Sequence, residues 1–273
     1  MLCGVLGPRG TFSEEAAKLY WGPEVTVAAA PSIPALFHML GGGEVKDLMV
    51  PIDNSEAGSL EVCLNCLLEY PVGIKGEIVM PVRQHLIGAQ KYVGEELELL
   101  ISHPMALLQC SDFIHHHLSG VRTEVSSSTA QALQIAGSES RKAAAIGNLR
   151  AAGIYGLKVI EMDIQNQSNA TRFLHIGRES PHIRAGEKAS LICSLPDTPG
   201  SLYKALEIFA LKNLNLIKIE SRSHAKKQGR FYFYIEVEVG GAQELLNQAL
   251  EELRYYCHDF KFLGSYNRRK VDI

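Results

Sequence analysis

The chain has 273 residues, and at about 150 residues per domain this length predicts roughly two domains. Hydrophobic residues make up 46% and charged residues 21%, a globular balance that excludes a disordered chain, a coiled coil and a collagen-like fibre. The 27 Lys and Arg residues against 30 Asp and Glu residues give a net charge of −3, which argues against nucleic acid as a partner.

Targeting and redox features point to an ordinary cellular protein. No apolar run approaches the ~18 residues of a spanning helix, and the first ten residues lack the basic and apolar regions of a secretory signal. Six cysteines are spread over the whole chain, and in a chain this large they need not form a disulfide framework. We therefore expect a cytoplasmic protein without a membrane partner.

The first two thirds of the chain alternate short apolar runs with helical patterns. Repeated strand–helix units are typical of α/β folds with parallel sheets, in which ligands gather where strand ends meet helix N-termini. The expected strands and the helices that follow them are 2–6 with 13–20, 48–51 with 60–68, 99–101 with 105–118, and 123–125 with 129–136.

A polar segment with Pro and Gly at 179–188 is interpreted as a linker. The pattern after it predicts strand, helix, strand, strand, helix and strand at 189–195, 202–211, 216–221, 231–239, 244–256 and 261–266. This βαββαβ order is that of a ferredoxin-like unit, which is common as a ligand-sensing or dimerising module. Its amphipathic helices, or its aromatic edge at 231–234, favour a homodimer or homotetramer.

Polar junctions carry the candidate chemistry. Thr11 and Glu14 have the spacing of a capping box, and a helix N-terminus with free N–H groups attracts carboxylates or phosphates. Three more junctions follow, at Asn54 and Ser55, at 126–129 and at 166–174. Each alone is more often an N-cap than a ligand site. Together they predict a cleft lined with neutral donors and suited to a small anion.

Other features predict no metal site and no cofactor. Cys63 and Cys66 form a single C-x-x-C inside an apolar helical stretch, and the three histidines of 115–117 point around a helix rather than together. Neither a Ser-His-Asp order nor an H-E-x-x-H motif is present. The basic run 268–270 is interpreted as a solvated tail.

The chain also carries a series of ordered blocks: Gly7–Glu14, Pro51–Ser55, Gly76–Pro81, Ser102–Pro104, Gln109–Cys110, Ser128–Ala130, Ala143–Ile146, Asn169–Phe173, Pro199–Leu202 and Glu220–Arg222. In this order they resemble the prephenate dehydratase family, followed by an ACT regulatory domain. The resemblance implies a monofunctional carbon–oxygen lyase that converts prephenate to phenylpyruvate in phenylalanine biosynthesis. It also implies feedback regulation by L-phenylalanine through the ACT domain, and no cofactor.

The resemblance further implies a two-lobed catalytic domain at 1–180, like a type II periplasmic binding protein, and an ACT domain at 188–273. The chain would cross between the lobes near 78–81 and 164–173, with the active site in the cleft. Thr171 matches the catalytic threonine. The implied substrate-binding residues are Thr11, Asn54, Ser55, Ser128, Thr129, Arg172 and Phe173. The implied effector-binding residues, between subunits, are Gly200, Ser201, Leu202, Glu220, Ser221 and Arg222.

The chemistry suits these residue types, because loss of carbon dioxide and water from prephenate forms an aromatic ring and needs no redox group. We expect Thr171 to donate to the departing ring hydroxyl, Arg172 to hold the pyruvyl carboxylate, and Phe173 to lie near the ring.

Three residues depart from the family pattern. Asp53 replaces the usual Glu and could change a polar contact in the cleft, and Ser201 and Ser223 leave the identity of the effector open. Two alternative functions remain: an arogenate dehydratase, and a non-catalytic small-anion sensor with an ACT dimerisation module.

Overall fold

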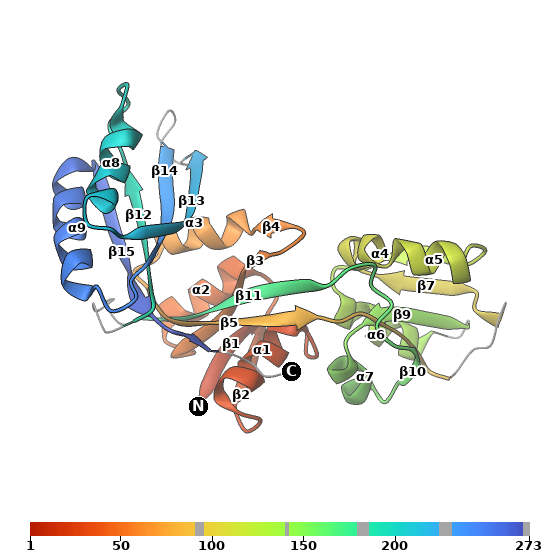
Figure 1. Cartoon of the computed structure of the whole chain (residues 1–273). Coiled ribbons are helices and arrows are strands. Elements are labelled where there is room, and N and C mark those ends of the chain that lie inside the picture. Colours follow the sequence, from red (N-terminus) through yellow and green to blue (C-terminus); the bar gives the residue numbers. More distant parts are fainter. Residues whose placement is uncertain (91–95, 140–141, 179–185, 224–230, 270–273) are drawn as a thin grey trace.

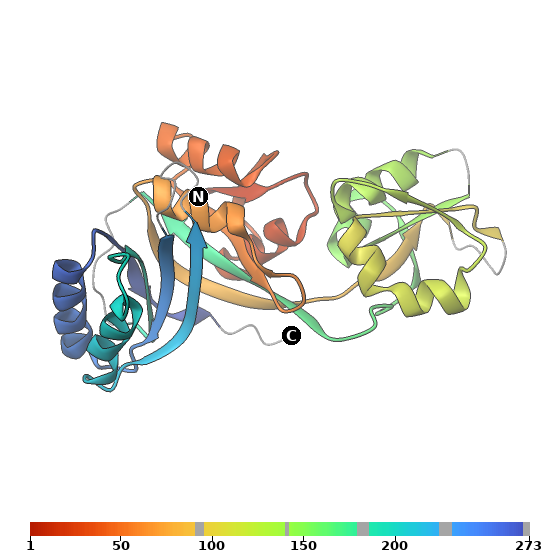
Figure 2. The ribbon, with the colours of Figure 1, turned by 90° about the horizontal axis from the view of Figure 1, so that it is seen from above.

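The structure, a computed structural model, describes residues 1–90, 96–139, 142–178, 186–223 and 231–269. Two α/β units, lobe 1 and lobe 2, are joined by extended strands, and a third unit, the C-terminal domain, packs on lobe 1 (Figure 1). Seen from above, lobe 1 lies between the other two units (Figure 2). The expected linker at 179–188 lies outside the described residues up to position 185.

Lobe 1 is a mixed sheet with helices on both faces. Its strands lie in the order β16-β5-β11-β3-β1-β2, with β1 parallel to its neighbours and β11 antiparallel to both of its own. Helix α1 packs on one face of the sheet, and α2 and α3 pack on the other. Its elements are β1 (Leu2–Leu6), α1 (Phe12–Trp21), β2 (Thr26–Ala30), α2 (Ile33–Gly42), β3 (Asp47–Asn54), β4 (Gly58–Ser59), α3 (Glu61–Glu69), β5 (Gly73–Val82), β11 (Asn169–Gly177) and β16 (Arg268–Arg269).

Lobe 2 is a smaller sheet with strands in the order β10-β6-β9-β7-β8. Alanines at 143–145 in β9 have no exposed surface, so helices pack closely on both of its faces. Its elements are β6 (His85–Gly88), β7 (Leu99–Ser102), α4 (Pro104–Gln109), α5 (Ser111–His117), β8 (Arg122–Val125), α6 (Thr129–Ser138), β9 (Ala143–Gly147), α7 (Leu149–Tyr155) and β10 (Lys158–Glu161).

The two lobes share one topology because each receives a strand from the other side of the crossing. In lobe 1, β11 returns from lobe 2 and inserts between β3 and β5; in lobe 2, β6 inserts between β9 and β10. This order is that of a type II periplasmic binding protein, so the predicted fold class is confirmed. The first crossing lies at 83–84, just after the expected 78–81, because those residues still pair with β11. The second lies at 162–168, before β11 begins.

The C-terminal domain has the predicted βαββαβ order and a sheet ordered β13-β14-β12-β15. Helices α8 and α9 cover one face of this sheet. The other face packs on lobe 1, where Tyr232, Tyr234 and Tyr266 join the core formed by α2 and α3. Its elements are β12 (Lys188–Ser194), α8 (Ser201–Ala210), β13 (Asn215–Ser223), β14 (Phe231–Glu238), α9 (Gln243–Tyr256) and β15 (Asp259–Tyr266).

Three sequence interpretations are corrected by this arrangement. The aromatic segment 231–234 is not a sheet edge, because β14 pairs with both β12 and β13; Tyr232 and Tyr234 are buried against lobe 1, while Phe231 is 57% exposed. The expected helix 105–118 is two helices, because Asn166 accepts a hydrogen bond from the Asp112 N–H and donates its own N–H to the Gln109 carbonyl at the break. The basic run at 268–270 is exposed as expected at its described residues but is not a free tail: residues 268–269 form β16 against β5, and position 270 lies outside the described residues.

Candidate active site

A pocket of about 280 Å³ lies between the two lobes, beside the crossings. Lobe 1 contributes the turn before α1 and the ends of β3 and β11, and lobe 2 contributes α4 and the start of α6. Its polar walls are Thr11, Ser13, Asn54, Gln84, His103, Gln109, Ser127, Ser128, Thr129, Asn169 and Thr171, and its apolar walls include Phe12, Pro51 and Phe173. The structure thus brings Thr11, Asn54, Ser128 and Thr129, from strand–helix junctions, together with Thr171 and Phe173 of β11.

Two helices begin at this pocket. Thr11 is the N-cap of α1, and Ser128 is the N-cap of α6, where its Oγ accepts a hydrogen bond from Gln131 N at 3.1 Å. The first N–H groups of a helix carry partial positive charge and bind anions. Both helix ends are therefore suited to a carboxylate in the pocket.

The expected capping box at Thr11 and Glu14 is wrong. Thr11 Oγ1 donates to the Leu6 carbonyl at 2.6 Å, and the Glu14 carboxylate accepts from Gly10 N at 2.7 Å and from Arg150 of lobe 2 at 2.9 Å. Burial would raise the pKa of Glu14, but these two donors bring it below its usual value. Glu14 therefore joins the lobes at one side of the pocket.

Thr171 is held by neighbouring amides. It lies opposite Asn54 in the β11–β3 ladder, and Asn54 Nδ2 donates to Thr171 Oγ1 and to Asn169 Oδ1, both at 2.8 Å. Within the described part of the chain, Thr171 Oγ1 accepts one hydrogen bond and donates none, so its proton remains available to a molecule in the pocket. Ser55 does not line the pocket; its hydroxyl donates to Asn169 Oδ1 at 2.8 Å and so supports this cluster.

A β-bulge gives the pocket its shape. The register between β11 and β3 shifts after Arg172, so that Phe173 pairs with Pro51 and Ile52 has no partner across β11. A bulge turns the side chains beyond it to the opposite face of a sheet. Pro51 and Asn54, three residues apart, consequently both face the pocket, while Ile52 packs in the core on the other side.

Two buried amide atoms at the pocket lack a partner among the described residues: Asn169 Nδ2 and Gln84 Oε1. Asn169 is 4% exposed and Gln84 is 3% exposed. An unsatisfied buried polar atom is costly, and here both atoms belong to residues of the pocket wall. Within the described residues, one donor and one acceptor at the pocket wall are therefore left unpaired.

Sequence reasoning assigned no role to Asn169, Gln84, His103 or Gln109. Asn169, His103 and Gln109 stand in blocks that matched the family, which was the available signal; Gln84, at the crossing, had none. Burial lowers the pKa of His103, so its imidazole is uncharged at pH 7. Its Nδ1 accepts a hydrogen bond from Met105 N at 3.3 Å.

Arg172 does not line the pocket, in contrast to the prediction. Alternate residues of a strand face opposite sides, so Thr171 and Phe173 face the pocket while Arg172 faces the C-terminal domain. Its guanidinium contacts the carboxylates of Asp53 at 2.6 Å, Glu77 at 3.0 Å and Glu236 at 2.6 Å. Asp53 does not line the pocket either and pairs with Arg172 and Lys218, so the change in a polar cleft contact expected at this position is not found.

The predicted effector residues fall on two sides of the C-terminal sheet. Gly200, Ser201 and Leu202 form the start of α8, and Ser201 and Leu202 line a cavity of about 280 Å³. Glu220 instead faces lobe 1, where it accepts hydrogen bonds from Ser59 and Arg222. Ser221 lies on the opposite face of β13. Ser221 pairs with Phe233, which lines the same cavity as Ser201 and Leu202, but none of Glu220, Ser221 and Arg222 is part of that lining.

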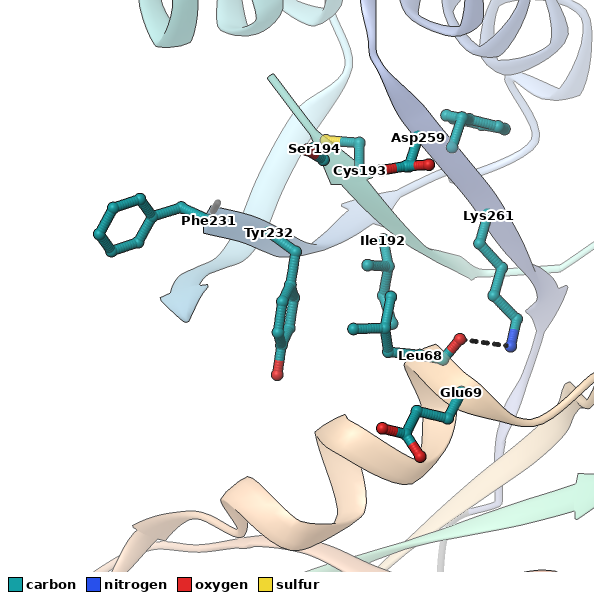
Figure 3. Close-up of a pocket in the computed structure, with 10 residues that line it drawn as sticks. Leu68, Glu69, Ile192, Cys193, Ser194, Phe231, Tyr232, Asp259 and Lys261 are labelled. Carbon is teal, nitrogen blue, oxygen red and sulfur yellow. Dashed lines mark hydrogen bonds between the residues drawn. The ribbon is translucent and has the colours of Figure 1, made fainter. Parts of the chain in front are cut away.

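Another cavity, of about 250 Å³, lies where the C-terminal sheet meets the end of α3 (Figure 3). Lys261 reaches from β15 to the carbonyl oxygens of Leu67, Leu68 and Tyr70. A cation at a helix C-terminus is favourable, so Lys261 attaches the C-terminal domain to lobe 1. No group of three metal-ligating side chains occurs among the residues that the structure describes, and none of their helices is long and apolar enough to span a membrane.

Comparisons with known proteins agree with these features. A family model described as prephenate dehydratase matches residues 3–181, and one described as ACT domain matches residues 189–255. The prephenate dehydratase of Bacillus subtilis is 31% identical over 280 residues, covering 97% of this chain and 98% of that protein. The chloroplastic arogenate dehydratase/prephenate dehydratase 2 of Arabidopsis thaliana is 35% identical, covering 95% and 71%.

A solved structure of a prephenate dehydratase has the same fold. The prephenate dehydratase of Arthrobacter aurescens, in complex with L-Phe, superimposes with a TM-score of 0.88 at 27% identity, covering all of this chain and 92% of that one.

Proposed function

The chain belongs to the prephenate dehydratase family, and we propose that its interlobe pocket converts prephenate to phenylpyruvate with Thr171 as the hydroxyl donor. The observation that carries the assignment of Thr171 is its hydrogen bond from Asn54 Nδ2 at 2.8 Å. Because Oγ1 accepts this bond, the hydroxyl proton is left to point at the substrate. Thr171 and Asn54 thereby act as one preorganised donor.

The reaction is a decarboxylative elimination. The bond between the ring and its carboxylate breaks, carbon dioxide leaves, and the electron pair moves through the diene to expel the hydroxyl group at the opposite ring carbon. A hydrogen bond from Thr171 stabilises the departing oxygen, which leaves as water after protonation. The high pKa of an alcohol suits Thr171 to the role of donor or relay rather than to that of a free proton source.

The other residues of the pocket bind the substrate and exclude water. The N-termini of α1 and α6, with Thr11, Ser128 and Thr129, hold the pyruvyl carboxylate in place of Arg172. The free Asn169 Nδ2 donates to a substrate oxygen. Phe173, 1% exposed, lies against the ring and excludes water where the ring carboxylate loses its charge.

Steady-state assays of phenylpyruvate absorbance test this function. We expect the wild type to convert prephenate, Thr171→Ala to lose at least about 10²-fold in kcat, and Thr171→Ser, which keeps the hydroxyl, to stay within about tenfold of the wild type. Near-wild-type turnover by the alanine variant would remove Thr171 from the mechanism. Turnover of arogenate alone would favour an arogenate dehydratase, and turnover of neither substrate would favour a binding protein.

We further propose that residues 1–180 carry catalysis and that residues 188–273 bind L-phenylalanine. The ACT family match and the L-Phe complex of the Arthrobacter enzyme support an effector site in this domain. Since Glu220 and Arg222 contact lobe 1 while Ser201 and Leu202 line a cavity on the helix side of the sheet, a second subunit completes the effector site formed by Gly200, Ser201, Leu202, Glu220, Ser221 and Arg222.

A homodimer or homotetramer follows from that site. Apolar side chains exposed on the C-terminal domain support it, among them Tyr203 at 66%, Leu211 at 78% and Ile219 at 44%. Sedimentation with and without L-phenylalanine tests this assembly; a monomer at micromolar concentration in both conditions would contradict it.

A further inference from the structure

A cluster of buried charges lies behind Thr171, on the far side of the lobe 1 sheet. We name it the interdomain charge cluster, because lobe 1 and the C-terminal domain both contribute to it. Its members are Asp53, Glu77 and Arg172 from lobe 1, Lys188, Lys218 and Glu236 from the C-terminal sheet, and Arg268 of β16.

Arg172 is the centre of the cluster. Its Nη2 lies 2.6 Å from Asp53 Oδ2 and 2.6 Å from Glu236 Oε1, and its Nη1 lies 3.0 Å from Glu77 Oε2. Asp53 and Glu77 come from β3 and β5, the two strands that flank β11. Glu236 comes from β14, so one guanidinium joins three strands of lobe 1 to the C-terminal sheet.

Burial makes this connection stiff. Glu77 is 0%, Glu236 2% and Arg172 8% exposed. Breaking a buried ion pair leaves an uncompensated charge without water and is strongly unfavourable. When the C-terminal sheet moves relative to lobe 1, Arg172 and its strand must therefore follow Glu236 or lose this pairing.

Two strands carry a pocket residue and a cluster residue side by side. Arg172 follows Thr171 in β11, and Asp53 precedes Asn54 in β3. The same two pairs face one another in the ladder, Thr171 opposite Asn54 and Arg172 opposite Asp53. A displacement of the cluster consequently reaches the Asn54–Thr171 hydrogen bond over a single peptide unit in each strand.

The predicted effector motif connects to the same cluster. Glu220 lies 3.7 Å from Lys218, Lys218 lies 2.7 Å from Asp53, and Lys218 also donates to Ser59 at 2.7 Å. A continuous set of charged contacts therefore runs from β13 through Lys218 and Asp53 to Arg172.

We propose that Arg172 is a positioning residue, which couples the C-terminal domain to the reaction by holding Thr171 and Asn54 through its pairing with Glu236 and Asp53. The proposal rests on the proposed function of the pocket. It assigns the C-terminal domain a part in turnover even without effector, because Glu236 helps to fix the geometry of the hydroxyl donor.

The test compares Glu236→Gln with Glu238→Gln in the full-length protein. The first variant keeps the size of the side chain and an acceptor for Tyr234 but removes the charge beside Arg172. The second removes the same charge from the same strand and the same face, at an exposed residue that contacts Asn215. The kcat and KM for prephenate are measured for both, with and without saturating L-phenylalanine.

We expect Glu236→Gln to lower kcat by at least about 5-fold with KM within about 2-fold, because a displaced donor weakens the transition state more than substrate binding. The change in kcat/KM that L-phenylalanine produces should shrink by at least about 5-fold. Glu238→Gln should match the wild type in both. A Glu236→Gln enzyme with wild-type kcat would overturn the proposal, as would equal losses in the two variants.

Folding and function are controlled separately. If circular dichroism shows that Glu236→Gln is unfolded, Lys218→Met replaces it, since Lys218 is half-buried at the edge of the cluster and should change kcat in the same direction. Wild-type kcat in a folded Lys218→Met protein would then decide against the proposal. Failure of the wild type to form phenylpyruvate would instead refute the proposed function. The kcat comparison holds whether or not L-phenylalanine acts on the wild type.

Discussion

Replacing Arg172 by methionine leaves two buried carboxylates, Glu77 and Glu236, and the half-buried carboxylate of Asp53 facing one another. Removing one partner of a buried ion pair typically costs about 3–5 kcal/mol. Asp53 retains Lys218 at 2.7 Å and Glu77 retains Lys188 at 2.9 Å, so we place the loss at the lower end, about 3 kcal/mol. For a chain of this size that corresponds to a fall of about 6–12 °C in Tm.

The loss depends on pH in a direction that the pKa values fix. Burial would raise the pKa values of Asp53 and Glu77, but Arg172 and the neighbouring lysines hold both below their usual values. Such carboxylates stabilise the fold above their unfolded pKa values, and this stabilisation is lost as the pH falls through the folded ones. Without Arg172 they take up protons at higher pH. The difference in unfolding free energy between wild type and variant should therefore be largest near pH 7 and shrink towards pH 4.

Urea unfolding measures this difference. Far-ultraviolet circular dichroism reports the whole chain, and the single tryptophan, Trp21, reports lobe 1, where it packs against Tyr20 and His175. Arg122→Met serves as the control, because Arg122 is exposed in β8 and pairs only with Glu124 among its described contacts; it should change stability by less than about 0.5 kcal/mol. A loss below about 1 kcal/mol for Arg172→Met at pH 7, or an equal loss at pH 7 and pH 4, would refute the reasoning.

Three further changes probe the pocket and the domain contacts. Gly10 has a φ of +87°, and a Cβ there would lie 3.0 Å from that of Ala151 in lobe 2. Gly10→Ala should therefore lower the unfolding free energy measured in urea by about 1–3 kcal/mol and raise KM by spreading the lobes. An unchanged KM would show that the lobes close without this contact. Asn169→Ala removes a buried donor from the pocket wall. In steady-state assays it should lower kcat/KM for prephenate at least about tenfold, which corresponds to the free energy of one hydrogen bond to a charged group. A smaller loss would mean that Nδ2 donates to no substrate oxygen. Lys261→Met removes the cation at the end of α3 and should lower the unfolding free energy by about 0.5–2 kcal/mol without changing kcat. An equally stable variant would show that the tyrosines and the interdomain charge cluster hold the domains together without Lys261.

The fold was predictable from the sequence where a local sequence pattern determines a single helix or strand. Strand–helix junctions at Thr11 and Asn54 indicated a shared site, because parallel strands place these ends at the same edge of the lobe 1 sheet. Ser128 follows β8 of the other sheet, and the two-lobed fold brings it to the same cleft. The C-terminal domain was predictable for the same reason, since its helices have one apolar face and its strands alternate.

The sequence could not predict which face Arg172 takes. Its neighbours Thr171 and Phe173 suggested a common site, and only pairing with β3 and the packing of the C-terminal sheet place it on the other side. The bulge at Ile52 is equally invisible, because it depends on register between segments more than 100 residues apart. The interface of Tyr232 and Tyr234 with lobe 1 was missed because alternation in a strand shows that a face is buried, not what buries it.

The inserted strand β11 also has a consequence for synthesis on the ribosome. Thr171 follows its ladder partner Asn54 by 117 positions, so the central strand of lobe 1 emerges only after all of lobe 2. Lobe 2, which is continuous from β6 to β10, has every strand of its sheet before then. The nascent chain should therefore complete lobe 2 first, and β3 must wait with an unpaired edge until β11 arrives.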